Sequence, residues 1–138
     1  MTSTSGKSHL WLRAAALVGL LFGLMTIREG AAVLFFDGAA RAAAGNYVPF
    51  VLWFNFLAGF AYVAAGVGLW FRRRWGLRLA IAVAVATFLV FVAFGWHVII
   101  GGAYEMRTVV AMTLRSTIWL VIAAIGWRVL NRHVIASP

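Results

Sequence analysis

The sequence LRLAIAVAVATFLVFVAFGWHVII occupies residues 77–100 and decides the fold class. It carries one arginine near its start, one histidine near its end and no acidic residue. A helix of about 20 such residues spans the roughly 30 Å hydrocarbon layer of a bilayer. We therefore predict that residues 77–100 form a transmembrane helix.

Three further apolar stretches accompany this one. They cover residues 10–36, 48–71 and 108–130, and each exceeds the length of about 20 residues that a membrane span requires. Hydrophobic residues make up 64% of the 138-residue chain and charged residues 11%, far from the balance of a soluble domain. The predicted fold is all-α, a transmembrane four-helix bundle with short loops, formed by residues 1–138 as a single domain.

Basic residues gather on one side of these spans. Short loops rich in lysine and arginine stay in the cytoplasm, so we predict that both termini lie inside. The net charge of +9 is thereby explained without nucleic-acid binding. The basic residues on the predicted inner side are Lys7, Arg13, Arg72, Arg73, Arg74, Arg78, Arg128 and Arg132.

The basic turn between the second and third spans should determine this orientation. Arg72, Arg73, Arg74 and Arg78 lie within or next to it, and such clusters also contact anionic lipid head groups. The predicted location is the bacterial inner membrane, as a multi-pass protein. The expected partners are the lipid bilayer and a second copy or another membrane protein.

The N-terminus permits a second interpretation. Lys7–Arg13 and the uncharged Ala14–Ile27 resemble the first two regions of a signal peptide, with a cleavage site near Gly30–Ala32. Against this, Arg28–Glu29 interrupts the apolar run, and three remaining spans would disturb the charge distribution. We expect the first span to be retained.

The connections between spans are short. Arg72–Gly76 is barely a turn, so the second and third spans should be antiparallel neighbours. Asp37 is predicted to cap a brief helix over Gly38–Ala44, which Gly45 ends in a left-handed conformation. Pro49 suits the first turn of the next span.

Small residues predict which helix faces meet, because membrane helices associate through them. Gly19 and Gly23 form a GxxxG pair on the first span. The second span carries Ala58, Ala65 and Gly68 on the face of Asn55, and the third carries Ala82, Ala86 and Ala93 on the face of His97.

Polar residues inside the spans come out at one depth. With a helical rise of 1.5 Å per residue, Arg28, Asn55 and Arg115 each lie about 10 Å below the outer surface. A charge there costs a few kcal/mol, so we expect it to be paired. The seven polar residues at or near this level are Arg28, Glu29, Asn55, His97, Glu105, Arg107 and Arg115.

Two interpretations of this layer remain open. In the first, an ionised Glu29 pairs with Arg115 or Arg28, Asn55 and His97 complete the hydrogen bonds, and the layer only fixes the helices in register. In the second, the excess positive charge makes an outward-facing pocket for an anionic head group or a small acid.

Other chemistry is poorly represented. The chain has no cysteine and shows no phosphate-binding loop, HExxH motif or nucleophile–base pair. His9 and His133 are predicted on the opposite side from His97, which argues against bis-histidine haem. We predict no cofactor and no metal. A Cu(I) site would be the alternative to ordinary packing of the methionines, with His97, Glu105, Met106 and Met112 as donors.

One segment resembles a known family. Residues 57–69, LAGFAYVAAGVGL, precede a basic turn and an Ala/Val-rich span that ends at His97, and Arg13 precedes Gly19 in the first span. This pattern resembles the DoxX-like four-span bacterial membrane proteins over spans one to three. Two positions depart from the family's pattern. The usual acidic residue of its second span is replaced here by an aromatic or apolar residue near Tyr62, and the lysine that ends its first span is replaced by Arg28–Glu29. The segment Gly101–Arg115 is similar to uncharacterised bacterial membrane proteins.

The function predicted from these features is that of a non-enzymatic accessory or small-ligand-binding component of the inner membrane. The DoxX-like resemblance implies one alternative, a subunit linked to quinones or electron transport. A second alternative is a carrier for a small solute or ion, which would act as an oligomer because four helices leave little room for a path.

Overall fold

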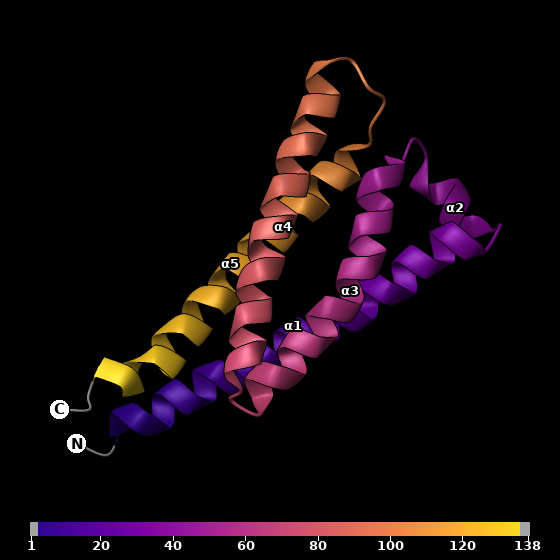
Figure 1. The fold of residues 1–138 in the computed structure, drawn as a ribbon. Helices are drawn as coiled ribbons and strands as arrows, with labels where there is room; N and C mark the ends of the chain where they lie inside the picture. Colours follow the sequence, from indigo (N-terminus) through magenta and orange to yellow (C-terminus); the bar gives the residue numbers. More distant parts are fainter. Residues whose placement is uncertain (1–2, 136–138) are drawn as a thin grey trace.

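The computed structural model describes residues 3–135 and the side chains of residues 5–132, so the side chain of His133 lies outside the described part. The described chain forms four long helices and one short helix (Figure 1). The predicted all-α bundle with four apolar helices is confirmed. The helices are α1 (Ser3–Phe35), α2 (Ala39–Ala44), α3 (Pro49–Trp70), α4 (Arg74–Ile99) and α5 (Met106–Ile135).

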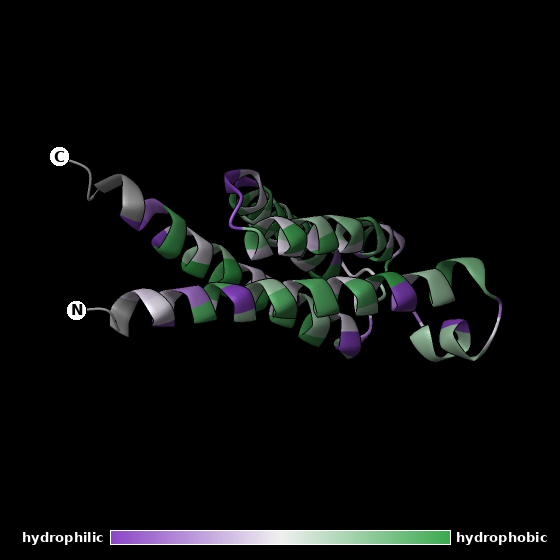
Figure 2. Cartoon of the chain, turned by 90° about the horizontal axis from the view of Figure 1, so that it is seen from below, coloured by the Kyte–Doolittle hydropathy of each residue, from purple (hydrophilic) through white to green (hydrophobic). Residues whose placement is uncertain are grey.

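Each long helix can cross a bilayer. The shortest, α3, has 22 residues, which corresponds to a length of about 33 Å. The outward faces are also apolar (Figure 2), and large side chains such as Leu21, Phe60, Leu89 and Leu120 are more than half exposed in the isolated chain. Helices that are apolar on every side need lipid around them. The architecture is that of a multi-pass membrane protein.

The four long helices pack as a ring in the order α1, α3, α4 and α5. The most extensive contact joins α1 to α3, and α4 contacts both α3 and α5. Helix α5 also contacts α1, which closes the ring. No extensive contact links α1 to α4 in the described part of the chain. Residues on these two helices therefore face each other only across the bundle.

The two ends of the bundle differ in chemistry. At one end, a buried apolar cluster joins Leu12 of α1, Leu69 and Leu77 beside the α3–α4 turn, and Leu130 of α5. We call this the arginine end, because the turn contains Arg72 and Arg73 and α4 begins at Arg74. The opposite end, where α2 and the α4–α5 loop lie, is called the cavity end.

Two close approaches between backbones fix the packing. A Cβ atom on Gly68 would lie 2.6 Å from the Cα atom of Gly76, so α3 and α4 can meet here only without side chains. Gly23 on α1 and Gly59 on α3 make a similar approach, where a Cβ on Gly23 would lie 2.9 Å from the Gly59 carbonyl oxygen. Gly23 thus lies on a contact face, as the GxxxG pattern predicts.

The connections mostly follow the prediction. Helix α2 ends at Gly45, whose φ is 60°, and Pro49 lies in the first turn of α3. Asp37 does not cap α2, because Gly38 occupies the N-cap position and no side chain bonds there. The Asp37 carboxylate oxygen lies instead 3.9 Å from Nη1 of Arg41. The capping prediction was wrong because Asp37 lies one residue before the N-cap position of α2, and its carboxylate lies near the side chain of Arg41, four residues later.

The predicted contact face of the third span was also wrong. Ala82 and Ala93 are exposed, whereas Leu77, Ala80 and Thr87 are buried. The contact between Gly76 and its partner on α3 fixes the rotation of α4 about its axis, and this rotation turns the predicted alanine face outward.

Candidate functional site

A cavity of about 460 Å³ lies at the cavity end, between α1, α3 and α5. Helix α2 closes one side of it with Ala40, Ala43 and Ala44, and the segment after α2 adds Tyr47 and Val48. Apolar side chains thus form much of the wall. A volume of this size is typical of pockets for small molecules, which lie in the range of roughly 300–1,000 Å³.

The sequence predicts seven polar residues at or near one depth in the membrane. Six of these seven residues line the cavity. They belong to α1, α3, α5 and the loop before α5, so four separate segments contribute to one site. The equal rise along antiparallel helices explains why residues so far apart in the sequence meet here. The six residues are Arg28, Glu29, Asn55, Glu105, Arg107 and Arg115.

His97 is the residue that does not join them. Its Nε2 atom lies 3.0 Å from the carbonyl oxygen of Ala103, and its ring packs against Phe50 with a centroid distance of 6.1 Å. A Cβ on Gly102 would collide with the same ring. His97 therefore holds the loop that follows α4. His97 is not among the cavity-lining residues, because its ring turns toward the Ala103 carbonyl oxygen and Phe50.

Asn55 and Arg115 form the buried part of the cavity lining. Their side chains are 8% and 9% exposed. Within the described chain, neither Oδ1 of Asn55 nor Nε of Arg115 has a hydrogen-bond partner. The guanidinium carbon of Arg115 lies 5.7 Å from the centroid of the Phe22 ring. Asn55 and Arg115 therefore bring to the cavity lining a buried acceptor and a buried donor that have no partner within the described chain.

The predicted contact ion pair of Glu29 is not formed. Glu29 interacts electrostatically with Arg115, but the ion pair closer than 4.0 Å in the described chain joins Arg41 to Asp37. Glu29 is exposed, whereas Arg115 extends over Phe22 inside the bundle. Equal depth does not imply contact, because the direction of each side chain around its helix decides which groups meet.

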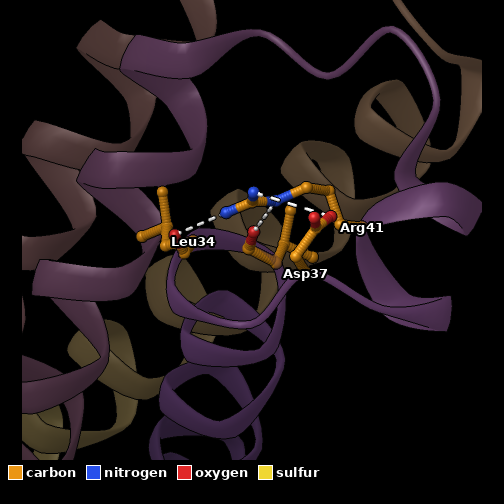
Figure 3. Close-up of polar contacts among 4 residues, drawn as sticks. Leu34, Asp37 and Arg41 are labelled. Atoms are coloured by element: carbon orange, nitrogen blue, oxygen red, sulfur yellow. Dashed lines mark hydrogen bonds and ion pairs between the residues drawn. The ribbon is translucent and has the colours of Figure 1, made fainter.

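Hydrogen bonds hold α2 beside the cavity. Arg41 donates from Nε to the Val33 carbonyl oxygen at 2.8 Å and from Nη2 to the Leu34 carbonyl oxygen at 2.7 Å (Figure 3). These carbonyls belong to the last turn of α1, where the helix provides no backbone N–H groups to bond them. Arg41 therefore ties α2 to α1.

A second set of bonds ties the same segment to the start of α5. Nη1 of Arg107 donates to the Ala43 carbonyl oxygen at 3.0 Å, and Oε1 of Glu105 accepts from the backbone N–H of Asn46 at 2.9 Å. Both charged residues also line the cavity. Glu105 and Arg107 thus hold α2 in position and also contribute charge to the cavity lining.

Sequence reasoning missed a group of polar residues deeper in the bundle. Each of them is buried and has an unpartnered polar atom within the described chain. The rings of Tyr62 and Trp119 lie 4.7 Å apart between their centroids. The sequence signal that could have revealed three of them is a hydroxyl-bearing residue within an otherwise apolar span. The group consists of Tyr62, Thr87, Ser116 and Trp119.

The structure does not assemble the alternative Cu(I) donors. Met112 is fully buried in a small apolar cluster with Val48 and Phe94, whereas Met106 is 63% exposed. No group of three or more His, Asp or Glu residues suited to a metal ion occurs in the part of the chain that the structure describes. Met112 therefore packs inside the bundle, and Met106 faces outward.

The arginines of the α3–α4 turn stay at the surface. Arg72, Arg73, Arg74 and Arg78 are all exposed, far from the cavity residues in the chain and at the other end of the bundle. Arg72 has a positive φ of 56°, and its Nη1 lies 3.4 Å from Nε2 of His9 on α1. This turn is therefore packed against the start of α1.

The charged residues of the cavity lining carry more positive than negative charge. Three arginines and two glutamates line the cavity, and Glu105 already accepts a backbone hydrogen bond. The lining hydroxyls belong to Thr26, Tyr47 and Thr108, and the lining set contains no histidine. Comparisons of the chain with protein-family models, with curated proteins and with solved structures found no match.

Proposed function

We propose that this protein binds a small anionic group in the cavity beside α2 and that it acts as a binding component of the membrane, not as an enzyme. One observation carries the proposal. Arg115 is nine-tenths buried, lines the cavity and has no acidic group in contact. A buried guanidinium without an acidic group in contact is costly, and an anionic ligand would supply that contact.

The alternative of a purely structural layer is less favoured by the geometry. A structural layer should satisfy its own hydrogen bonds, because partly satisfied buried networks are less stable than apolar packing. Here Oδ1 of Asn55 and Nε of Arg115 have no partner within the described chain, and both residues belong to the cavity lining. Intramembrane charged residues of this kind usually serve binding or transport.

The proposed setting is a bacterial cytoplasmic membrane, with the arginine end inside. The short α3–α4 turn carries the densest positive charge, and such turns remain in the cytoplasm. In that orientation, both termini lie inside and the cavity opens in the outer leaflet. Its ligand would then be a solute or head group from the outer side.

Thermal unfolding in a neutral detergent tests the proposal. We would measure unfolding midpoints with inorganic phosphate, glycerol 3-phosphate or octanoate, each against chloride at equal ionic strength. A ligand at 100 times its Kd stabilises the folded state by about 2.7 kcal/mol. At least one probe should raise the midpoint of the native protein. The Arg115→Met and Asn55→Leu variants should lose this response.

Arg128→Met is the matched control, because it removes an exposed arginine at the arginine end. Its response to the probes should equal that of the native protein. An equal response in Arg115→Met, or no probe acting better than chloride on the native protein, would refute the proposal.

The two alternative functions require further components. A carrier would have to open a path past Tyr62 and Trp119, whose side chains fill the middle of the bundle. A DoxX-type electron-transport subunit would retain a quinone or a redox partner during purification. Mass spectrometry of co-purified lipids, quinones and proteins distinguishes these alternatives from the binding function.

A further inference from the structure

The cavity beside α2 has a polar end and an apolar wall. On α5, Ala111 lines the cavity four positions before Arg115, so the two residues share one helix face. On α3, Val51 and Leu52 line the cavity about one turn before Asn55, again nearer the start of the helix. Asn55 and Arg115 are buried, and we call this pair the floor of the cavity. Val51, Leu52 and Ala111 form its wall.

Helix α2 limits the length of this wall. Arg107 lies two turns before Arg115 on α5, a separation of about 12 Å along the helix axis. At that level its Nη1 atom donates to the carbonyl oxygen of Ala43, and both Ala43 and Ala44 line the cavity. The apolar space between the floor and α2 is therefore short. It suits a small apolar group better than a lipid tail.

The charges of the lining favour a ligand with one negative charge. Three arginines and two glutamates line the cavity, so the formal net charge of the lining is +1. A monoanion brings this total to zero, whereas a dianion leaves an excess negative charge beside Glu29 and Glu105. Arg115 is the buried arginine of the set, and the other two are exposed. The anionic group of a ligand is therefore most strongly favoured at the floor.

We propose that the ligand of this cavity is a short-chain monocarboxylate, with its carboxylate at the floor and its apolar group along the wall. This inference rests on the proposed function and names the class of ligand. The planar guanidinium of Arg115 matches a carboxylate, and the Asn55 side chain can also hydrogen-bond it. A dicarboxylate would place a second charge near the two glutamates. A long acyl chain would have to pass α2.

Isothermal titration calorimetry of the full chain in neutral detergent provides the test. Hexanoate, adipate and 1-hexanol share a six-carbon chain and differ in charge. We expect hexanoate to bind, adipate to bind about tenfold more weakly because like charges repel, and 1-hexanol not to bind. From acetate to hexanoate, each added methylene should raise affinity about fourfold. Dodecanoate should bind no more tightly than hexanoate. Arg115→Met should abolish hexanoate binding, and Arg128→Met should leave it unchanged.

Further variants test the wall and the charge separately. Ala111→Leu shortens the apolar space and should lower the affinity for hexanoate while that for acetate is kept. Ala82→Leu, at an exposed position of α4, is the matched control and should bind both acids as the native protein does. Ala44→Leu fills the same space from α2 and replaces Ala111→Leu if circular dichroism shows that variant to be unfolded. Glu29→Gln should reduce the preference for hexanoate over adipate by up to about fivefold.

The outcomes separate this inference from the proposed function. Equal affinities for hexanoate and adipate, both lost in Arg115→Met, would overturn the monocarboxylate class and leave the anion site standing. Anion binding that is the same in Arg115→Met and in the native protein would overturn both. Tighter binding of dodecanoate than of hexanoate would assign the site to a lipid-derived acid and refute the short chain. An unchanged preference for hexanoate over acetate in the folded wall variant would remove the wall from the site.

Discussion

Arg107 of α5 donates a hydrogen bond from Nη1 to the carbonyl oxygen of Ala43 in α2 at 3.0 Å, across 64 positions of sequence. The same arginine lines the cavity. One side chain thus connects the charge of the site with the segment that closes its side.

The first prediction concerns this bond. Arg107→Gln should loosen α2, because a hydrogen bond of this kind contributes about 1 kcal/mol. Hydrogen–deuterium exchange of residues 38–46 should become about fivefold faster, while the overall unfolding midpoint changes little. Arg78→Gln, at the other end, is the control and should leave exchange of α2 unchanged. Equal exchange in both variants would show that Arg41 and Glu105 hold α2 without Arg107.

The second prediction concerns the buried charge of Arg115. No carboxylate contacts the Arg115 guanidinium, so Arg115→Met should increase the free energy of unfolding by on the order of 1 kcal/mol in the absence of added ligand. The unfolding midpoint in detergent should rise accordingly. Glu29→Gln should change stability by less than about 0.5 kcal/mol, as is usual for exposed positions. If both variants are less stable and the double variant recovers the loss, a true Glu29–Arg115 pair exists and the structural interpretation of the layer gains support.

The third prediction tests the approach of α3 to α4. Gly76→Ala should destabilise the protein by about 2 kcal/mol, because the added methyl group meets backbone atoms of Gly68 and Leu69 that cannot move aside. Gly95→Ala is the matched control on the same helix, where a Cβ atom would meet no other atom within 4 Å. That variant should be unchanged or up to about 1 kcal/mol more stable. Denaturant titrations in detergent compare the two, and similar losses would mean that the approach is not rigid.

The fourth prediction concerns orientation. Replacing Arg72, Arg73, Arg74 and Arg78 with glutamine should produce mixed orientations, because these charges outweigh those of the other loops. The chain has no cysteine, so a single cysteine at Ala42 reports sidedness through labelling of intact cells with an impermeant reagent. Native orientation predicts labelling from outside. Unchanged labelling in the glutamine variant would show that other residues determine orientation.

Reporter fusions give an independent check of the same topology. A reporter after Pro138 or within residues 72–76 should be cytoplasmic, and one within residues 39–46 should be outside. A periplasmic signal from the C-terminal fusion would contradict the proposed orientation, although not the four-helix fold.

The lengths of the helices and the shared level of several polar residues along the bundle could be predicted from the sequence, but the rotation of each helix about its axis could not. Apolar length fixes where a span begins and ends, and the rise per residue brought Asn55 and Arg115 to the same cavity. His97 does not line that cavity, because its ring turns toward the Ala103 carbonyl oxygen and Phe50. Which face of α4 turns inward depends on the Gly68–Gly76 approach, and that approach is a property of two helices together.

The α3–α4 connection has a consequence for biosynthesis. A connection of three residues, Phe71–Arg73, joins the two helices. The backbones of α3 and α4 touch at Gly68 and Gly76, close to this turn. Two helices joined so closely cannot enter the membrane one after the other with a long interval. We expect them to leave the translocation machinery as a preformed hairpin. An insertion error would then invert both helices at once and carry the three arginines 72–74 to the wrong side together.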